Sequence, residues 1–439
     1  MRIRPTIAAV GVLVVYLALA TTWSYVIPLG GGIDEPRHLR YVQIVAEEAR
    51  LPTVAEKQEA ISHHPPLHYL LAAPVYLATR GLGREASWHA VRFVSVLLGA
   101  VGILVVFAML RRALPQRPWA GVVGMAAVGW LPHYQLVSAM VSNDVTAALA
   151  GALALYAATR AITEPERSAV FAFAAGIAAG AGVMAKMNAL VLLPAPLLAV
   201  TIAPMLSRRT PEASDERQPP PGPHGAMQNA LACAVAFLGT GGITIGYHLM
   251  KWGRLESDPP WPEAAWPVHT FGAKLLRAIG GLFRSTWAQV GWLPGPHSPP
   301  PPGPTARWPR PDLETPLLAL ALMLTLAAIV GSVVLAVRWL RSEQTRGRGL
   351  AMAMLLLASA LMYGVLVQNA IYVNPGRYEG GRYLLPAVAA SMALLAIGPL
   401  ALPRRWRIAA WVATPAMLLV MNAVAFWEFY AYLIPTFAP

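Results

Sequence analysis

Ionisable side chains suited to acid–base chemistry follow the first apolar segment. The stretch reads Asp34-Glu35-Pro36-Arg37-His38. A proline suits the first turn of a helix, and His38 lies three and four residues after the two carboxylates, so all three side chains could share one helix face. A carboxylate placed in this way can act as a general base. The alternative is a helix start whose dipole stabilises two solvated carboxylates.

A second polar stretch, His63-His64-Pro65-Pro66-Leu67-His68-Tyr69, lies about 25 residues further along the chain. Histidine and carboxylate side chains are ligands for divalent metals, which suggests Glu35, His38 and His63 as a candidate metal site. The spacing differs from the HExxH pattern of zinc proteases, and histidine clusters without a fixed ligand spacing also occur without a metal. The sequence therefore leaves metal binding open.

Four cations fall near the ends of apolar segments that are expected to meet at one membrane surface. They are Arg92, Lys186, Arg377 and Arg382. Such a group, with Tyr383 beside it, is suited to binding a phosphate. Further polar residues are expected at the same depth and are assigned supporting roles: His63, His64, His133, Asn143 and Asp144. Singly, each could be a helix cap or an interfacial anchor, and Asp144 could instead neutralise one cation.

The composition indicates a membrane protein. Of the 439 residues, 56% are hydrophobic and 13% charged, and the mean hydropathy is +0.51. The net charge of +13 comes from arginines in short clusters between apolar runs, which is typical of cytoplasmic loops and argues against nucleic acid as a partner. With one cysteine, Cys233, an intrachain disulfide is excluded.

Apolar runs predict an all-α integral membrane protein of about eleven transmembrane helices, forming one domain over 1–439. The predicted spans are 7–29, 89–110, 119–137, 142–160, 169–184, 186–206, 228–250, 315–337, 349–371, 384–402 and 408–432. The first could be a signal peptide cleaved at Ala18-Leu19-Ala20, but its length favours a retained helix.

Alternate gaps between these spans are rich in arginine, which predicts a cytoplasmic N-terminus. Two long segments, 30–88 and 251–312, then lie outside the cytoplasm and form two extracytoplasmic loops. Each is expected to carry a juxtamembrane helix: a proline-rich one over 65–82, and an amphipathic one over 268–290. The segment 207–227 is rich in proline and is predicted to be a disordered cytoplasmic linker.

These motifs together resemble the GT-C superfamily of membrane glycosyltransferases. The resemblance rests on the acidic pair with His38, on His64-Pro65-Pro66-Leu67-His68-Tyr69, on Asn143-Asp144, and on Gly380-Gly381-Arg382-Tyr383-Leu384-Leu385-Pro386. The stretch Phe283-Arg284-Ser285-Thr286-Trp287 is most similar to an uncharacterised bacterial and archaeal branch. Protein O-mannosyltransferases and aminoarabinose transferases are more distant relatives. They often have Lys-Pro-Pro where this chain has His64-Pro65-Pro66, so how His64 contributes is open.

The resemblance implies a glycosyltransferase of the cell membrane that moves a sugar from a polyprenyl-phosphate carrier to an extracytoplasmic glycan, lipid or protein, with inversion. Asp34 matches the family's general base, with Glu35 and His38 orienting it or a metal. The four cations and Tyr383 would bind the donor phosphate. Two rivals remain: a transporter or flippase, for which ionisable groups at mid-bilayer would be expected, and a non-catalytic membrane scaffold.

Overall fold

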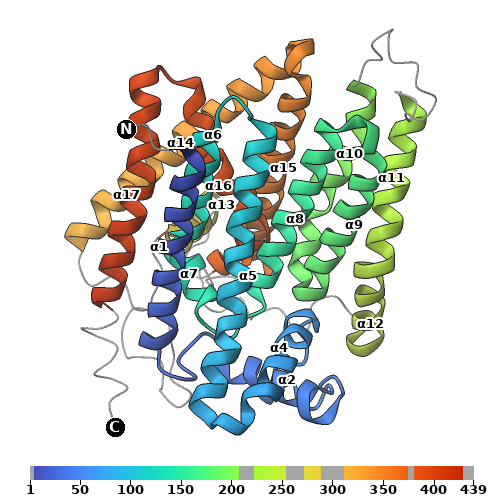
Figure 1. Ribbon diagram of the computed structural model, residues 1–439, viewed down its shortest axis with the longest axis vertical. Coiled ribbons are helices and arrows are strands. Elements are labelled where there is room, and N and C mark those ends of the chain that lie inside the picture. Colours follow the sequence, from blue (N-terminus) through green and yellow to red (C-terminus); the bar gives the residue numbers. More distant parts are fainter. Residues whose placement is uncertain (1–3, 207–221, 254–270, 288–310, 374–379, 429–439) are drawn as a thin grey trace.

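We describe a computed structural model of the protein, from which residues 1–3, 207–221, 254–270, 288–310, 374–379 and 429–439 are left out. The described residues form helices and connecting turns and contain no strand. Most of the helices run along the long axis of the molecule and pack as one bundle (Figure 1). The all-α membrane class predicted from the sequence is confirmed.

Ten helical segments in the described part of the chain are long and apolar enough to span a membrane. Five are single helices and five contain 3-10 or π turns. They are α1 (Pro5–Val26), α5 (Arg84–Ala113), α8 (Asp144–Thr163), η2 with α9 (Pro165–Arg167, Ser168–Ala185), η3 with α10 (Met187–Leu192, Pro194–Leu206), α11 with η4 and α12 (Pro223–Phe237, Leu238–Gly242, Ile243–Trp252), α14 (Pro311–Arg341), η6 with α15 and η7 (Glu343–Thr345, Arg346–Gln368, Asn369–Val373), η8 with α16 and η9 (Gly380–Ala387, Val388–Ile397, Gly398–Ala401) and α17 (Arg404–Glu428).

The one predicted span that is not among these ten, 119–137, is broken in the structure. It forms two short helices, α6 (Pro118–Gly129) and α7 (Pro132–Ser138). Pro132 has no N–H to continue the ladder of α6, so carbonyl groups at the break lack their helical partners. Side chains supply them: Gln135 donates to the carbonyl of Gly129, and Asn422 Nδ2 donates to that of Trp130 at 2.7 Å. A broken helix at this depth is tolerated because these groups are satisfied inside the protein.

The bundle has two chemically different ends. The turns that carry Arg111, Arg160, Arg341 and Arg404 lie at one end, which we call the arginine end. At the other end, the loop end, lie α2 (Glu35–Glu48), α3 (Lys57–Ala60), α4 (Leu67–Thr79) and η1 (Arg80–Leu82), drawn in blue at the bottom of Figure 1. The alternation of arginine clusters in the sequence therefore corresponds to an alternation of helix direction.

The helix α8 runs through the middle of the bundle and is built largely from alanine and other small residues. Small side chains allow helix backbones to approach closely. At Gly151 any side chain would collide with the backbone carbonyl of Pro386, so this glycine allows η8 to lie directly against α8. The contact brings the start of η8, with Arg382 and Tyr383, to the loop end of α8.

The layer at the loop end is fixed to the bundle by aromatic packing and by one lysine. Tyr41 of α2 stacks on Tyr69 of α4, with ring centroids 3.8 Å apart. Lys251, at the end of α12, donates to the backbone carbonyls of Pro52 at 2.5 Å and Ser62 at 3.2 Å. The segment that carries the predicted catalytic motif is thus held by α4 and, through the loop between α2 and α4, by α12.

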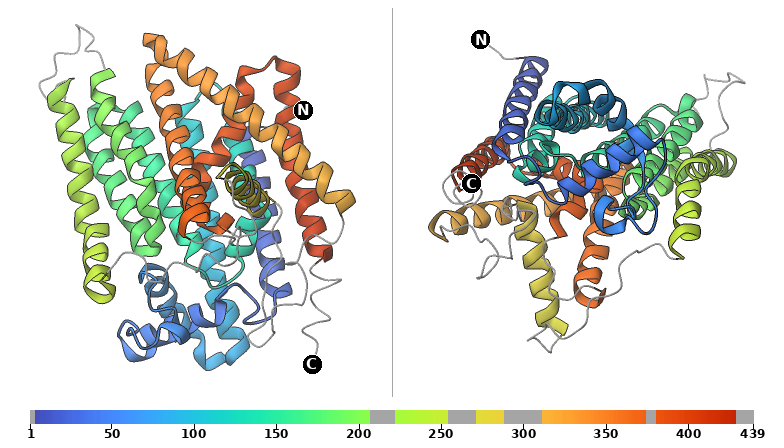
Figure 2. Two further views of the ribbon diagram at one scale, coloured as in Figure 1. Left: turned by 180° about the vertical axis from the view of Figure 1, so that it is seen from behind. Right: turned by 90° about the horizontal axis from the view of Figure 1, so that it is seen from below.

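The remaining predicted segments agree with the structure only in part. Helix α13 (Phe271–Trp287) forms the described part of the predicted helix 268–290, whose first and last three residues lie outside the described residues, and it lies crosswise to the spanning helices (Figure 2). The predicted linker 207–227 is too long, because α11 already begins at Pro223, and its first part lies outside the described residues. The first predicted span is the packed helix α1, whose Tyr16 hydroxyl donates to the carbonyl of Val96 at 3.1 Å.

Candidate active site

Asp34 lies at the N-terminus of α2 and faces a residue from the far end of the sequence. Its backbone has a φ of +57°, in the left-handed region that aspartate and asparagine adopt more readily than most residues. Oδ2 accepts from both terminal nitrogens of Arg382, at 3.2 and 3.3 Å, and Oδ1 lies 3.5 Å from Arg37 Nη1. The Asp34 side chain is 29% exposed, so it remains accessible to a substrate.

The charges around Asp34 keep it ionised. Burial raises the pKa of its carboxyl, but the neighbouring charges, above all the Arg382 guanidinium, outweigh burial and hold this pKa below its ordinary value. A carboxylate of this kind is unprotonated at neutral pH. It can therefore accept a proton, which is the first requirement for a general base.

A second ion pair lies beside the first. Lys186, between α9 and η3, pairs with Asp144 at the start of α8. Asp144 Oδ2 also accepts from the Ser142 hydroxyl at 3.0 Å, and the Lys186 ammonium lies 4.5 Å from the centre of the Tyr383 ring. Both charged side chains are buried.

Tyr383 joins the two ion pairs into one cluster. Arg382 Nη2 lies 3.3 Å from the Tyr383 hydroxyl, and the ring of Tyr383 faces Lys186. The side chain of Asn188 holds η8 in place by donating to the Tyr383 carbonyl at 2.8 Å. Four segments distant in sequence, at the starts of α2, α8, η3 and η8, therefore supply two carboxylates, two cations and a phenol at the loop end.

Histidines from α2 and α4 border this cluster. His38 Nδ1 lies 2.7 Å and His64 Nδ1 3.2 Å from the same hydroxyl, that of Tyr69, and His68 Nδ1 lies 2.8 Å from the Thr146 hydroxyl. Burial lowers the pKa of His38 to about 3 and of His68 to about 4, and it also holds the pKa of His64 well below its ordinary value. These imidazoles are neutral at neutral pH and act as polar, uncharged neighbours of Asp34.

The structure does not support the expected roles of Glu35 and Arg92. Glu35 accepts from Arg92 Nε and Nη2, both at 2.6 Å, and from the backbone N–H groups of Val141 and Gly32 at 3.1 and 3.2 Å. Arg92 also donates to three backbone carbonyls: Ser24 at 2.5 Å, and Ile27 and Pro28 at 2.8 Å. Both side chains are 0% exposed. All five guanidinium N–H groups are used, so none remains for a donor phosphate.

The predicted metal site is also not formed. Both carboxylate oxygens of Glu35 bind Arg92, so they do not face His38 or His63. Among the residues that the structure describes, no group of three histidine, cysteine or acidic side chains is arranged to hold a metal ion. Glu35, His38 and His63 therefore do not form a metal site in the described part of the chain.

The other predicted residues have mixed positions. Arg377 lies outside the described residues. The His63 ring lies 4.5 Å from that of His64, and His133 is buried in α7, which packs against η8. Asn143 precedes α8 without capping it, because its side chain donates to the Ala185 carbonyl at 2.7 Å and so fixes the turn before Lys186.

Three residues of the cluster were missed as individual candidates. They are Arg37, Tyr69 and Asn188. Tyr69 and Asn188 belong to polar stretches already noted in the sequence, His63–Tyr69 and Lys186–Asn188. Arg37 belongs to the acidic stretch itself, and its side chain donates to the backbone carbonyls of Gln58 at 2.8 Å and Lys57 at 2.9 Å. Only the fold shows that these groups face one another.

Comparisons with known proteins bear on the family and the fold. The model of the dolichyl-phosphate-mannose-protein mannosyltransferase family matches residues 63–214, a range that includes the histidine stretch, Asp144 and Lys186. No curated protein sequence matches the chain significantly.

Solved structures show the fold. The oligosaccharyltransferase of Archaeoglobus fulgidus, in complex with zinc and sulfate, is 13% identical with a TM-score of 0.54, over 95% of this chain and 53% of its own. Apo ArnT from Cupriavidus metallidurans is 14% identical with a TM-score of 0.53, over 96% of this chain and 76% of its own. The chain thus spans about half the length of the archaeal enzyme. The resemblance predicted from the motifs is confirmed: this protein has the fold of the GT-C membrane glycosyltransferases.

Proposed function

We propose that this protein is a glycosyltransferase that moves a sugar from a polyprenyl-phosphate carrier to an acceptor hydroxyl or amide outside the cytoplasm. The observation that carries the proposal is the partly exposed Asp34–Arg382 pair, whose members are 348 residues apart in sequence. It lies beside Lys186 and Tyr383, at the end of a bundle with the GT-C fold. A carboxylate next to a small cationic group suits a reaction that removes a proton and releases a phosphate.

In the proposed reaction Asp34 takes the proton of the acceptor. The acceptor atom attacks the anomeric carbon of the sugar, the bond from this carbon to the carrier phosphate breaks, and the phosphate leaves with the bonding electrons. Direct displacement of this kind inverts the anomeric centre. The proton then resides on Asp34 and is returned to solvent, to which this side chain is partly open.

The donor phosphate would bind to Arg382, Lys186 and the Tyr383 hydroxyl. Arg382 pairs with Asp34, so an arriving phosphate would compete with this carboxylate for the guanidinium. Donor binding would then release Asp34 from its strongest partner and make it a better base. This coupling means that Asp34 becomes fully active only when a donor is present.

The test is release of polyprenyl phosphate by the purified protein from a panel of synthetic polyprenyl-phosphate sugars, with membrane extract as the source of acceptor. We expect turnover with at least one donor, and loss of that turnover in Asp34→Asn. The exposed Glu59, in the same loop, provides the matched control, Glu59→Gln. If the carrier-linked sugar instead crossed the membrane intact and no donor of the panel was cleaved, the flippase would be favoured.

The proposal places the loop end outside the cytoplasm. The native Cys233 is buried, which keeps the background low in a thiol-labelling experiment. A cysteine at the exposed Thr53 should react with an impermeant reagent in intact cells, and one at the exposed Ser342 should not. Labelling of Ser342→Cys alone would reverse the orientation and remove the reason for a lipid-linked donor.

A further inference from the structure

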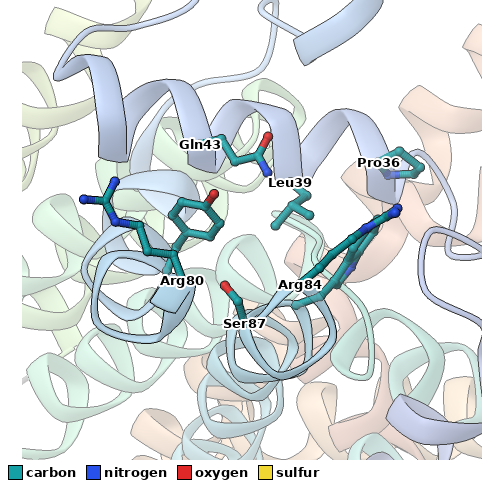
Figure 3. Close-up of a pocket in the computed structure, with 8 residues that line it drawn as sticks. Pro36, Leu39, Gln43, Arg80, Arg84 and Ser87 are labelled. Atoms are coloured by element: carbon teal, nitrogen blue, oxygen red, sulfur yellow. The ribbon is translucent and has the colours of Figure 1, made fainter. Parts of the chain in front are cut away.

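A pocket of about 490 Å³ lies at the loop end, between α2, α4 with η1, and the start of α5. Figure 3 shows Leu39 and Gln43 of α2 on one side and Arg84 and Ser87 of α5 on the other, with Arg80 at its edge. Asp34 and His38 are not among its lining residues. The pocket is therefore separate from the candidate active site, although one wall is the helix that begins next to Asp34.

The pocket is positively charged. The only carboxylate within ion-pair distance of either arginine, among the described residues, is Glu47, which lies 3.7 Å from Arg80 and also accepts from the Tyr76 hydroxyl at 3.1 Å. Arg84 has no acidic partner there, and its guanidinium lies 5.5 Å from the centre of the Trp88 ring. Glu47 thus pairs with Arg80 alone, and one carboxylate for two arginines leaves net positive charge, which favours an anionic ligand.

The surface beside the pocket is apolar. Helix α4 and the turn after it, which carry Tyr76 and Arg80 into the pocket, expose a row of leucines to the surroundings: Leu70, Leu71, Leu77 and Leu82, the last being 72% exposed. Helix α4 contains no Asp, Glu, Lys or Arg, and exposed leucines on such an apolar helix, at the end of a bundle of spanning helices, favour contact with the acyl chains of the membrane. With these leucines among the acyl chains, the two arginines would lie close to the lipid phosphates.

We propose that this pocket binds the phosphate headgroup of an anionic membrane lipid, with Arg80 and Arg84 contacting the phosphate and the acyl chains lying along the leucines of α4. The arginine fork matches the geometry of a phosphate, and the Ser87 hydroxyl lines the same pocket. A lipid held there contacts α2, α4 and α5 together, and so supports the helix that begins next to Asp34. The proposal does not depend on the proposed transferase activity.

The test is native mass spectrometry of the full chain in detergent, titrated with phosphatidylglycerol or phosphatidylcholine. We expect the first phosphatidylglycerol to bind at least about tenfold more tightly than phosphatidylcholine, because each arginine near the surface contributes about fivefold to the binding of an anionic lipid. Arg80→Gln with Arg84→Gln should weaken this first binding event about thirtyfold. The same pair of substitutions at the exposed Arg404 and Arg405, at the arginine end, is the matched control and should leave it unchanged.

Two further experiments complete the test. The first asks whether the pocket binds a lipid phosphate or free inorganic phosphate, and the second uses a variant that is not expected to disturb folding. Inorganic phosphate at millimolar concentration should compete weakly with phosphatidylglycerol; a protein that binds inorganic phosphate but not the lipid contradicts the lipid assignment. Gln43→Glu places a carboxylate in the pocket with almost no change in size and should also weaken phosphatidylglycerol binding. Unchanged affinity in both the double arginine variant and Gln43→Glu, with both folded, overturns the proposal.

Discussion

Asp34 and Glu35 are neighbours in the chain, and each pairs with an arginine, yet the two pairs differ in almost every physical respect. The Glu35–Arg92 pair is fully buried, with two parallel hydrogen bonds of 2.6 Å and with every guanidinium N–H in use. The Asp34–Arg382 pair is partly exposed, with longer contacts of 3.2 and 3.3 Å, both to one carboxylate oxygen.

This difference separates a structural role, that of Glu35, from the chemical role that we propose for Asp34. A buried ion pair whose donors are all satisfied offers nothing to a ligand, and removing either partner strands a charge inside the protein. A partly exposed pair contributes little to stability and can exchange partners at small cost. The protein therefore uses Glu35 to fasten the start of α2 to α1 and α5, and this leaves Asp34 positioned but exchangeable.

The largest effect should follow from Glu35→Gln. This change leaves the Arg92 guanidinium buried without its carboxylate, which costs about 3–5 kcal/mol, a large share of the stability of a typical protein. We expect a steep fall in the yield of monodisperse protein on size-exclusion chromatography and in its melting temperature. Restoration of stability by Glu35→Gln combined with Arg92→Met would show that the stranded charge is the cause; wild-type stability of Glu35→Gln alone would refute the structural role.

The same chemical change one residue earlier, Asp34→Asn, should have the opposite profile. Asparagine also adopts the left-handed backbone found at this position, so the melting temperature should stay within a few degrees of wild type. Turnover should fall about 10²–10⁴-fold, as expected for loss of a general base. Near-normal turnover, measured with any donor that the wild type accepts, would exclude Asp34 as the base.

Replacing Arg382 tests the exchange of partners between Asp34 and the donor. Arg382→Ala should weaken binding of a polyprenyl-phosphate sugar by about 1.5–3 kcal/mol, the range for hydrogen bonds to charged groups. Arg382→Lys should recover part of this loss, because the charge remains but the fork is absent. Donor titration by microscale thermophoresis measures both. Wild-type affinity in Arg382→Ala would remove Arg382 from the phosphate site.

The smallest effect is expected from pH. Asp34 has a lowered pKa, so its carboxylate stays ionised as the pH falls towards 4, and burial keeps His38 and His68 neutral to about pH 3 and 4. Turnover at low donor concentration, which reports the groups of the protein before the donor binds, should thus change less than about twofold between pH 5.5 and 7.5, since none of these three groups titrates in that window. A fall in turnover on the acid side, with its midpoint near the ordinary histidine pKa of about 6.5, would show that a histidine gains a proton during the reaction.

Much of the fold could be predicted because its signals are local. The helical class, the position of most spans and the two ends follow from runs of apolar residues and from alternating arginine clusters. The broken span at 119–137 was missed, although Pro132 was visible, because hydropathy does not register a helix break whose carbonyls are satisfied by distant side chains such as Asn422. The linker 207–227 was drawn too long because prolines also begin helices, as Pro223 does.

The sequence by itself determined which ionisable residues gather at the loop end, since their place along each apolar run fixes their depth. Only the tertiary structure decided which carboxylate meets which arginine. Glu35 finds Arg92 from 57 residues away, whereas Asp34 finds Arg382 from 348 residues away, and Lys186, expected to bind phosphate, is paired with Asp144. The physical reason is backbone geometry: Glu35 is the first residue of α2, whereas Asp34 precedes the helix with a left-handed backbone, so its carboxylate leaves the buried face on which Glu35 lies.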